Sequence, residues 1–232
     1  MDGVLIDSEA LHWESVGDVL QRELGDDAPQ LPPRIGWSDQ ELWPELRERW
    51  DLQPSVSELI RARARYAAQR LSAHPPPALP YALATLRHWR LIAPDLLFVV
   101  VSASPRLHID QSLYAFVDSA GQDLFHGRVS GVEDAAYNKP APDPYLVAMQ
   151  RLSLPPERCW IVEDSTTGIT AALGSGAPVF AVGAHSVSKD LRAHCVADLN
   201  TLTDLYNLWV DRIKTSQALT RLTLSDLTSP PL

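Results

Sequence analysis

Residues suited to acid, base and metal chemistry occur in four short stretches, Asp2-Gly3, Ser102-Ala103, Lys139 and Glu163-Asp164. The Glu163-Asp164 pair is the strongest signal, because two adjacent carboxylates repel each other unless a cation is close by. Mg²⁺ suits such a pair, since it takes hard oxygen ligands and keeps several of its waters. The alternative interpretation is an Asp that caps the next helix beside a solvated Glu. Gly3 allows the backbone to turn sharply directly after Asp2.

Strands and helices alternate in the second part of the sequence and would position these residues. Continuous apolar strands are predicted at 96–101, 127–130, 159–162 and 179–182, and helices at 79–89, 106–116, 144–152, 167–175 and 202–213. This alternation predicts a parallel sheet covered on both faces, which is a three-layer, doubly wound α/β core. Ligands of such sheets bind beyond the carboxyl ends of the strands. Ser102, Lys139 and Glu163-Asp164 each follow a predicted strand, so we expect them to share one site.

Residues 10–78 are expected to form a helical insertion that interrupts this core. Their pattern predicts helices at 10–24, 39–50 and 56–71 and contains no convincing strand. Ser38 and Glu41 have the spacing of a capping box at the second helix, while Pro44 would kink that helix or delay its start. We predict a core made of residues 1–9 and 79–213, a mobile cap at 10–78 that excludes water, and a tail at 214–232.

Composition narrows the range of partners. The chain has 232 residues and a formal net charge of -9, which argues against an electrostatic nucleic-acid surface. The arginine-rich run at 61–65 is interpreted as a solvated helix face.

Cys159 and Cys195 are expected to be free and buried thiols in a reducing compartment. With no run of ~18 apolar residues and no signal-peptide pattern, we expect a cytoplasmic protein without a membrane partner, either a monomer or a weak homodimer.

The opening Met1-Asp2-Gly3-Val4-Leu5-Ile6-Asp7-Ser8-Glu9 resembles the haloacid dehalogenase superfamily when it is read with the Lys-Pro-Ala-Pro-Asp-Pro string at 139–144 and the sequence at 162–169. The resemblance is to the phosphatase and sugar-phosphate mutase branch. It implies a Rossmann-like fold and a Mg²⁺-dependent phosphatase. Such an enzyme would hydrolyse a small phosphorylated metabolite, such as a sugar phosphate, through an aspartyl-phosphate.

The same resemblance implies a role for each matching residue. Asp2 would be the general acid and base and would also ligate Mg²⁺ through its backbone carbonyl. Asp164 would ligate Mg²⁺ directly, and Glu163 directly or through water. Ser102, the Ala103 backbone N–H and Lys139 would bind the phosphoryl group. His12, together with Ser8, matches positions of the β-phosphoglucomutase group, where the histidine assists proton transfer.

The family motif has a further aspartate, the nucleophile, two positions before the residue that Asp2 matches. This sequence has no counterpart for it, nor for the central strand that carries it. We hypothesise that the sequence is a truncated reading of a longer product, in which Met1 stands inside the motif. As written, the chain is expected to bind Mg²⁺ poorly and to turn over little phosphate.

Three alternative functions remain open. The stretch at 35–38 resembles the substrate loop of the cap, but Asp39 stands where the mutases carry an Arg, which favours a phosphatase over a hexose-phosphate mutase. A catalytically dead phosphate-binding protein is the alternative if no nucleophile precedes Asp2. Haloacid dehalogenation is disfavoured, because the Asp2-Gly3 and Glu163-Asp164 pairs suit the Mg²⁺-dependent phosphatases.

Overall fold

The computed structural model describes residues 1–32, 39–117 and 121–217. Backbone contacts divide the chain into two compact units. We call Met1–Ile6 with Ala78–Leu232 the core unit, and Asp7–Pro77 the helical unit. The substrate-loop stretch at 35–38, which includes the predicted cap residue Ser38, lies outside the described residues.

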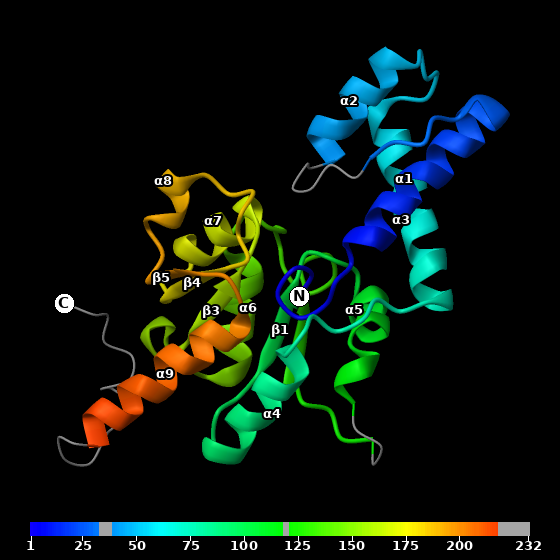
Figure 1. Cartoon of the computed structure of the whole chain (residues 1–232). Helices are drawn as coiled ribbons and strands as arrows, with labels where there is room; N and C mark the ends of the chain where they lie inside the picture. Colours follow the sequence, from blue (N-terminus) through cyan, green and yellow to red (C-terminus); the bar gives the residue numbers. More distant parts are fainter. Residues whose placement is uncertain (33–38, 118–120, 218–232) are drawn as a thin grey trace. The chain divides into compact units, whose positions relative to one another are not determined.

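The helical unit contains α1 (Glu9–Leu24), the 3-10 turn η1 (Gly25–Asp27), α2 (Asp39–Arg49) and α3 (Val56–Ala73) (Figure 1). Its apolar core is formed by fully buried side chains from all three α-helices, including Val19, Trp43 and Leu59. Ser55 begins α3 with a capping box, because its side chain accepts from the Glu58 N–H and the Glu58 carboxylate accepts from the Ser55 N–H. Pro44 lies inside α2 without delaying its start, which is at Asp39.

The strands of the core unit are β1 (Val99–Ser102), β2 (Gly127–Ser130), β3 (Ile161–Glu163), β4 (Val179–Val182) and β5 (Ala197–Leu199). Every pairing between them is parallel, so the predicted α/β class is confirmed. The described strands form two sheets, β1-β2 and β3-β4-β5, where the sequence predicted one. Within the described residues, β1 and β3 have no hydrogen-bonded strand between them.

Helices cover the strands of the core unit on both sides, which gives three layers. Val100, Val162 and Phe180 pack in a cluster with α4 (Ala82–Ile92) and α9 (Leu202–Gln217). The neighbouring positions Val101, Ile161 and Val179 pack instead with α6 (Asp143–Leu152) and α7 (Thr166–Gly174). Successive residues of a strand point to opposite faces, so the two sets define the two sides. In addition, α5 (Arg106–Ser112) contacts β2, and α8 (Lys189–Arg192) contacts α7.

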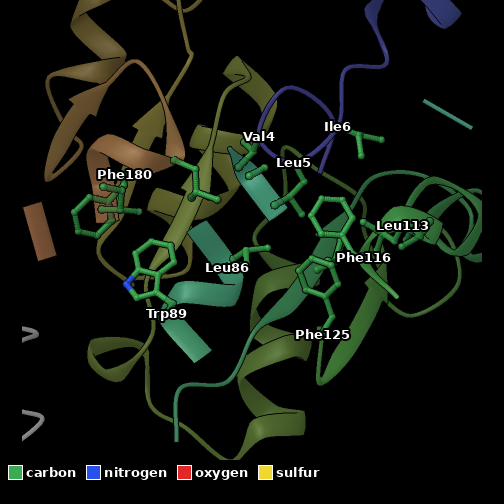
Figure 2. Close-up of a cluster of buried hydrophobic side chains, with 14 of the residues drawn as sticks. Val4, Leu5, Ile6, Leu86, Trp89, Leu113, Phe116, Phe125 and Phe180 are labelled. Atoms are coloured by element: carbon green, nitrogen blue, oxygen red, sulfur yellow. The ribbon is translucent and has the colours of Figure 1, made fainter. Parts of the chain in front are cut away.

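The first six residues of the chain belong to the core unit and form a turn. The Leu5 N–H donates to the Met1 carbonyl at 2.9 Å, and the Gly3 N–H donates to the Ile6 carbonyl at 3.1 Å. Val4, Leu5 and Ile6 are buried in the same cluster as Leu86, Trp89, Phe116 and Phe125 (Figure 2). This burial fixes the turn, and therefore the position of Asp2, against the apolar core.

Some boundaries differ from the prediction for local physical reasons. The helix expected from Leu79 begins at Ala82. Leu79 precedes Pro80 and therefore avoids the helical region, and Tyr81 has a left-handed backbone with a φ of 66°. The last helix continues past the predicted end at residue 213 to Gln217. Two short elements, β5 and α8, were not predicted. Cys159 and Cys195 are free as expected, but half-buried rather than buried.

Across the described part of the chain, every helix is too short or too polar to cross a membrane.

Candidate active site

The predicted site residues of the core unit lie where its strands end. Ser102 is the last residue of β1, Glu163 is the last residue of β3, and Asp164 follows directly. Lys139 lies in the loop between β2 and α6. Parallel strands present their carboxyl ends at one edge, which is the usual ligand site in α/β proteins.

Lys139 links the ends of β1 and β3. Its Nζ donates to Glu163 Oε1 at 2.6 Å and to the Val101 carbonyl at 3.0 Å. The side chains of Lys139 and Glu163 are only 7% and 5% exposed, so the ion pair is almost entirely removed from water. Burial alone would raise the pKa of Glu163. The charges of Lys139 and the Met1 ammonium, together with the hydrogen bonds from Lys139 and Tyr145, outweigh burial and hold the pKa below its usual range.

Tyr145 completes this buried group. Its hydroxyl donates to Glu163 Oε1, and its ring lies 4.7 Å from Lys139 Nζ, within cation-π range. Burial, followed by the charge of Glu163, raises the pKa of Tyr145 well above its usual value, so it remains a neutral donor. Glu163 Oε2 accepts from the Asp164 N–H and the Ser165 hydroxyl at 3.3 and 3.4 Å. Both oxygens of Glu163 are therefore engaged by protein donors.

Asp2 and Asp164 come together beside Gly3. A Cβ atom added to Gly3 would lie 1.8 Å from Asp164 Oδ2, so only glycine permits this approach of the turn to the carboxylate. Burial raises the pKa of Asp164 to about 6; the Met1 ammonium opposes this shift, and the carboxylates of Glu163 and Asp2 add to it. Two partly buried carboxylates placed close together repel each other. A bound cation would relieve this repulsion.

The donors present fit Mg²⁺. Among the described residues, the structure contains no cluster of three or more His, Cys, Asp or Glu side chains that could hold a metal. Mg²⁺ does not need one, because it is commonly bound through one or two carboxylates, waters and substrate phosphate oxygens. Asp164 can supply a carboxylate, and the backbone carbonyl of Asp2, which the family resemblance implies as a ligand, can supply a second oxygen. Direct ligation by Glu163 would have to displace its present donors, so a contact through water suits it better.

The Ser102 loop is ordered by hydrogen bonds to its own backbone and to the loop after β2. Ser102 is 5% exposed, and its Oγ accepts from the Ser104 N–H at 3.2 Å. The Ser102 carbonyl accepts from the Gly131 N–H at 2.7 Å, and the Ala103 carbonyl accepts from Asn138 Nδ2 at 3.0 Å. Because its oxygen already accepts one bond, the Ser102 hydroxyl can direct its proton toward a ligand.

His12 belongs to the helical unit, whereas the other predicted site residues belong to the core unit. Its Nδ1 lies 3.0 Å from Arg63 NH1, and since a guanidinium can only donate, Nδ1 accepts this bond. The Nε and NH2 atoms of Arg63 also donate to Asp39 Oδ2, at 3.1 and 2.6 Å. The arginine-rich run is thus only partly a solvated face, because Arg63 joins the three α-helices of this unit. The catalytic role of His12 stays a prediction.

Sequence reasoning assigned no role to Asn138, Tyr145 or Arg63. Asn138 and Tyr145 stand in or beside the proline-rich string that contains Lys139, which was the only signal for them. Arg63 was visible only as one residue of a basic run. Their partners lie 18 to 51 residues away along the chain.

Comparisons with known proteins identify the family of the chain. A family model described as haloacid dehalogenase-like hydrolase matches residues 1–176. The chain is 28% identical to a probable pseudouridine-5'-phosphatase of Drosophila melanogaster, covering 88% of each protein. It is 30% identical to hexitol phosphatase B of Escherichia coli K12, covering 88% of this chain and 91% of that one.

Among solved structures, CbbY from Rhodobacter sphaeroides in complex with phosphate superposes with a TM-score of 0.67 at 19% identity. The match covers 88% of this chain and 93% of that one, and it supports the likeness of fold. The family model spans most of the sequence and both halves of the site, from Asp2 to Asp164. The chain therefore belongs to the haloacid dehalogenase-like hydrolases.

Proposed function

We propose that the chain is a Mg²⁺-dependent phosphatase of a small phosphorylated metabolite, such as a sugar phosphate. The observation that carries this proposal is the meeting of the buried Lys139-Glu163 pair with the Asp2-Asp164 pair at the strand ends. One pair offers a cation to phosphoryl oxygens, and the other offers oxygen ligands to a metal. The relatives named as phosphatases support the same reaction class.

In the proposed reaction the phosphoryl group accepts hydrogen bonds from the Ser102 hydroxyl, the Ala103 N–H and Lys139. These groups stabilise the charge that develops on its oxygens. Bound Mg²⁺ would supply charge neutralisation that lets an anionic substrate approach the carboxylates. Asp2 protonates the leaving oxygen and later takes a proton from the hydrolytic water. The aspartyl-phosphate route also needs an attacking carboxylate, and we assign that role to no residue of this sequence.

The alternative within the family is a sugar-phosphate mutase. A mutase must hold two phosphate groups, but Asp39 stands where the mutases carry an Arg. Asp39 instead forms a 2.6 Å ion pair with Arg63. The lack of an arginine at position 39 favours a monophosphate substrate. A binding protein without turnover is the second alternative.

A substrate screen tests the proposal. Phosphate release is measured from a panel of phosphomonoesters, with Mg²⁺ or with EDTA, for this chain and for a chain extended by an apolar strand that ends in Asp before Met1. We expect Mg²⁺-dependent release by the extended chain and little by the unextended one. Conversion of hexose 1-phosphate to the 6-phosphate without release would favour the mutase. Phosphate binding by both chains with no turnover would favour the binding protein.

A further inference from the structure

Asn138 makes two hydrogen bonds that join the two phosphate-binding loops. Its Nδ2 donates to the Ala103 carbonyl at 3.0 Å, and its Oδ1 accepts from the Lys139 N–H at 2.8 Å. The first bond reaches the loop after β1, and the second fixes the backbone of the residue that supplies the ammonium group. The half-buried Asn138 thus lies between the groups proposed to hold the phosphoryl oxygens.

The bond to Ala103 also acts on the Ser102 hydroxyl. The Ala103 carbonyl belongs to the same peptide group as the Ser104 N–H, and this N–H donates to Ser102 Oγ at 3.2 Å. Holding that peptide group keeps the N–H directed at the Ser102 oxygen. The Ser102 proton is then left to point toward a ligand. Asn138 can therefore influence Ser102 and Lys139 without touching the phosphate.

The side chain at position 138 is matched to both partners. A carboxamide offers a donor to the carbonyl and an acceptor to the N–H, whereas a carboxylate can only accept. Gly131 provides the space, since a Cβ atom added there would lie 2.0 Å from Asn138 Oδ1. The Gly131 N–H in turn donates to the Ser102 carbonyl at 2.7 Å, which ties the two loops together a second time.

We propose that Asn138 is a positioning residue that orients the Ser102 hydroxyl and the Lys139 backbone for phosphate. The inference rests on the proposed function, because it requires that these groups bind a phosphoryl group. It predicts that loss of the carboxamide weakens phosphate binding through Ser102 and Lys139 rather than through loss of the fold.

Calorimetric titration of the full chain with inorganic phosphate at saturating Mg²⁺ tests this proposal. Asn138→Ala removes both bonds, and Asn138→Asp removes only the donor. Asn207→Ala and Asn207→Asp, at an exposed position on α9, are the matched controls for truncation and for added charge. Both Asn138 variants are expected to lose about tenfold in phosphate affinity, in keeping with the strength of ordinary hydrogen bonds, while the controls change little. Thermal unfolding of each variant checks that the fold persists.

A double-mutant cycle distinguishes positioning from a purely structural role. In a Ser102→Ala background, the loss caused by Asn138→Ala should shrink, because part of it acts through the missing hydroxyl. Full additivity, or equal affinities for the Asn138 variants and their Asn207 controls, would overturn the inference. If neither the unaltered chain nor the strand-extended chain binds phosphate, the proposed function itself fails and the inference falls with it.

Discussion

Gly3 is the position at which the site can least accommodate a side chain. Its φ is 66°, which is costly for other residues, and a Cβ atom there would meet both Oδ2 and Cγ of Asp164, at 1.8 and 2.6 Å. The clash is with a side chain that lies partly buried within electrostatic reach of the carboxylates of Glu163 and Asp2. A substituent at Gly3 must therefore move either the turn or the proposed metal ligand.

We expect Gly3→Ala to lower the free energy of unfolding by ~1–3 kcal/mol, because it combines backbone strain with overpacking. Urea unfolding measures this change. Gly17→Ala is the control, since a Cβ at Gly17, in the middle of α1, has no heavy atom within 4 Å. That control should be stabilising by up to ~1 kcal/mol, because alanine is the better helix former. Equal effects of the two substitutions would show that Gly3 is not constrained by Asp164.

At the scale of secondary structure elements, Asp134 connects the end of β2 with two helices. Its Oδ2 accepts from the Ser130 N–H at 2.7 Å and from Arg106 at the start of α5. Its Oδ1 accepts from Arg151 of α6 at 2.6 Å. These contacts hold the elements that flank the Ser102 and Lys139 loops. Burial would raise the pKa of Asp134, but Arg151, the Ser130 N–H and Arg106 outweigh it and leave the pKa below its usual value.

Asp134→Ala should lower the free energy of unfolding by ~1–3 kcal/mol at pH 7, mainly through the lost bond to the buried strand end. Because the pKa in the folded state is depressed, this contribution is fully present above the unfolded value of about 4. It is lost as the pH falls through the lower pKa of the folded state. The difference between the variant and the unaltered chain should therefore shrink between pH 7 and pH 3.

Chemical unfolding at the two pH values checks this prediction. Asp95→Ala, at an exposed position before β1, is the control and should change stability by less than ~0.5 kcal/mol at either pH. A difference for Asp134→Ala that stays constant down to pH 3 would mean that its charge contributes nothing.

At the scale of the whole molecule, the first motif belongs to a large apolar cluster of the core unit. Ile6 is fully buried in it, next to the turn that carries Asp2 (Figure 2). The turn is also tied to residues after the helical unit, because the Leu79 N–H donates to the Leu5 carbonyl at 2.8 Å. The position of Asp2 thus depends on long-range packing.

Ile6→Ala should lower the free energy of unfolding by ~2–5 kcal/mol, as expected for truncating a fully buried aliphatic side chain. Ile92→Ala is the matched control, because Ile92 is 51% exposed at the end of α4, and it should change stability by less than ~0.5 kcal/mol. Guanidinium unfolding of both variants measures the difference. A small effect at Ile6 would mean that the first motif is not part of the cooperative core.

Continuous apolar strands and strong amphipathic helices made the α/β fold predictable, as the runs that became β1 and β4 show. The short strand β5 was not predictable in this way. It contains a polar residue, Asp198, and owes its conformation to hydrogen bonds with β4.

The site was also only partly predictable, because contacts between distant parts of the chain cannot be read from a local pattern. Residue types pointed to Lys139 and Glu163, but their mutual pairing and the bond from Asn138 to Ala103 depend on contacts across 24 and 35 residues.

The measurement that tests the central claim most directly is Mg²⁺-dependent phosphate release by the strand-extended chain, compared between Asp2→Asn and Asp95→Asn. If Asp2 is the general acid and base, Asp2→Asn should reduce the rate by ~10²–10⁴-fold, while the exposed Asp95→Asn leaves it unchanged. Equal rates for the two variants, or release that persists in EDTA, would contradict the assignment of this site.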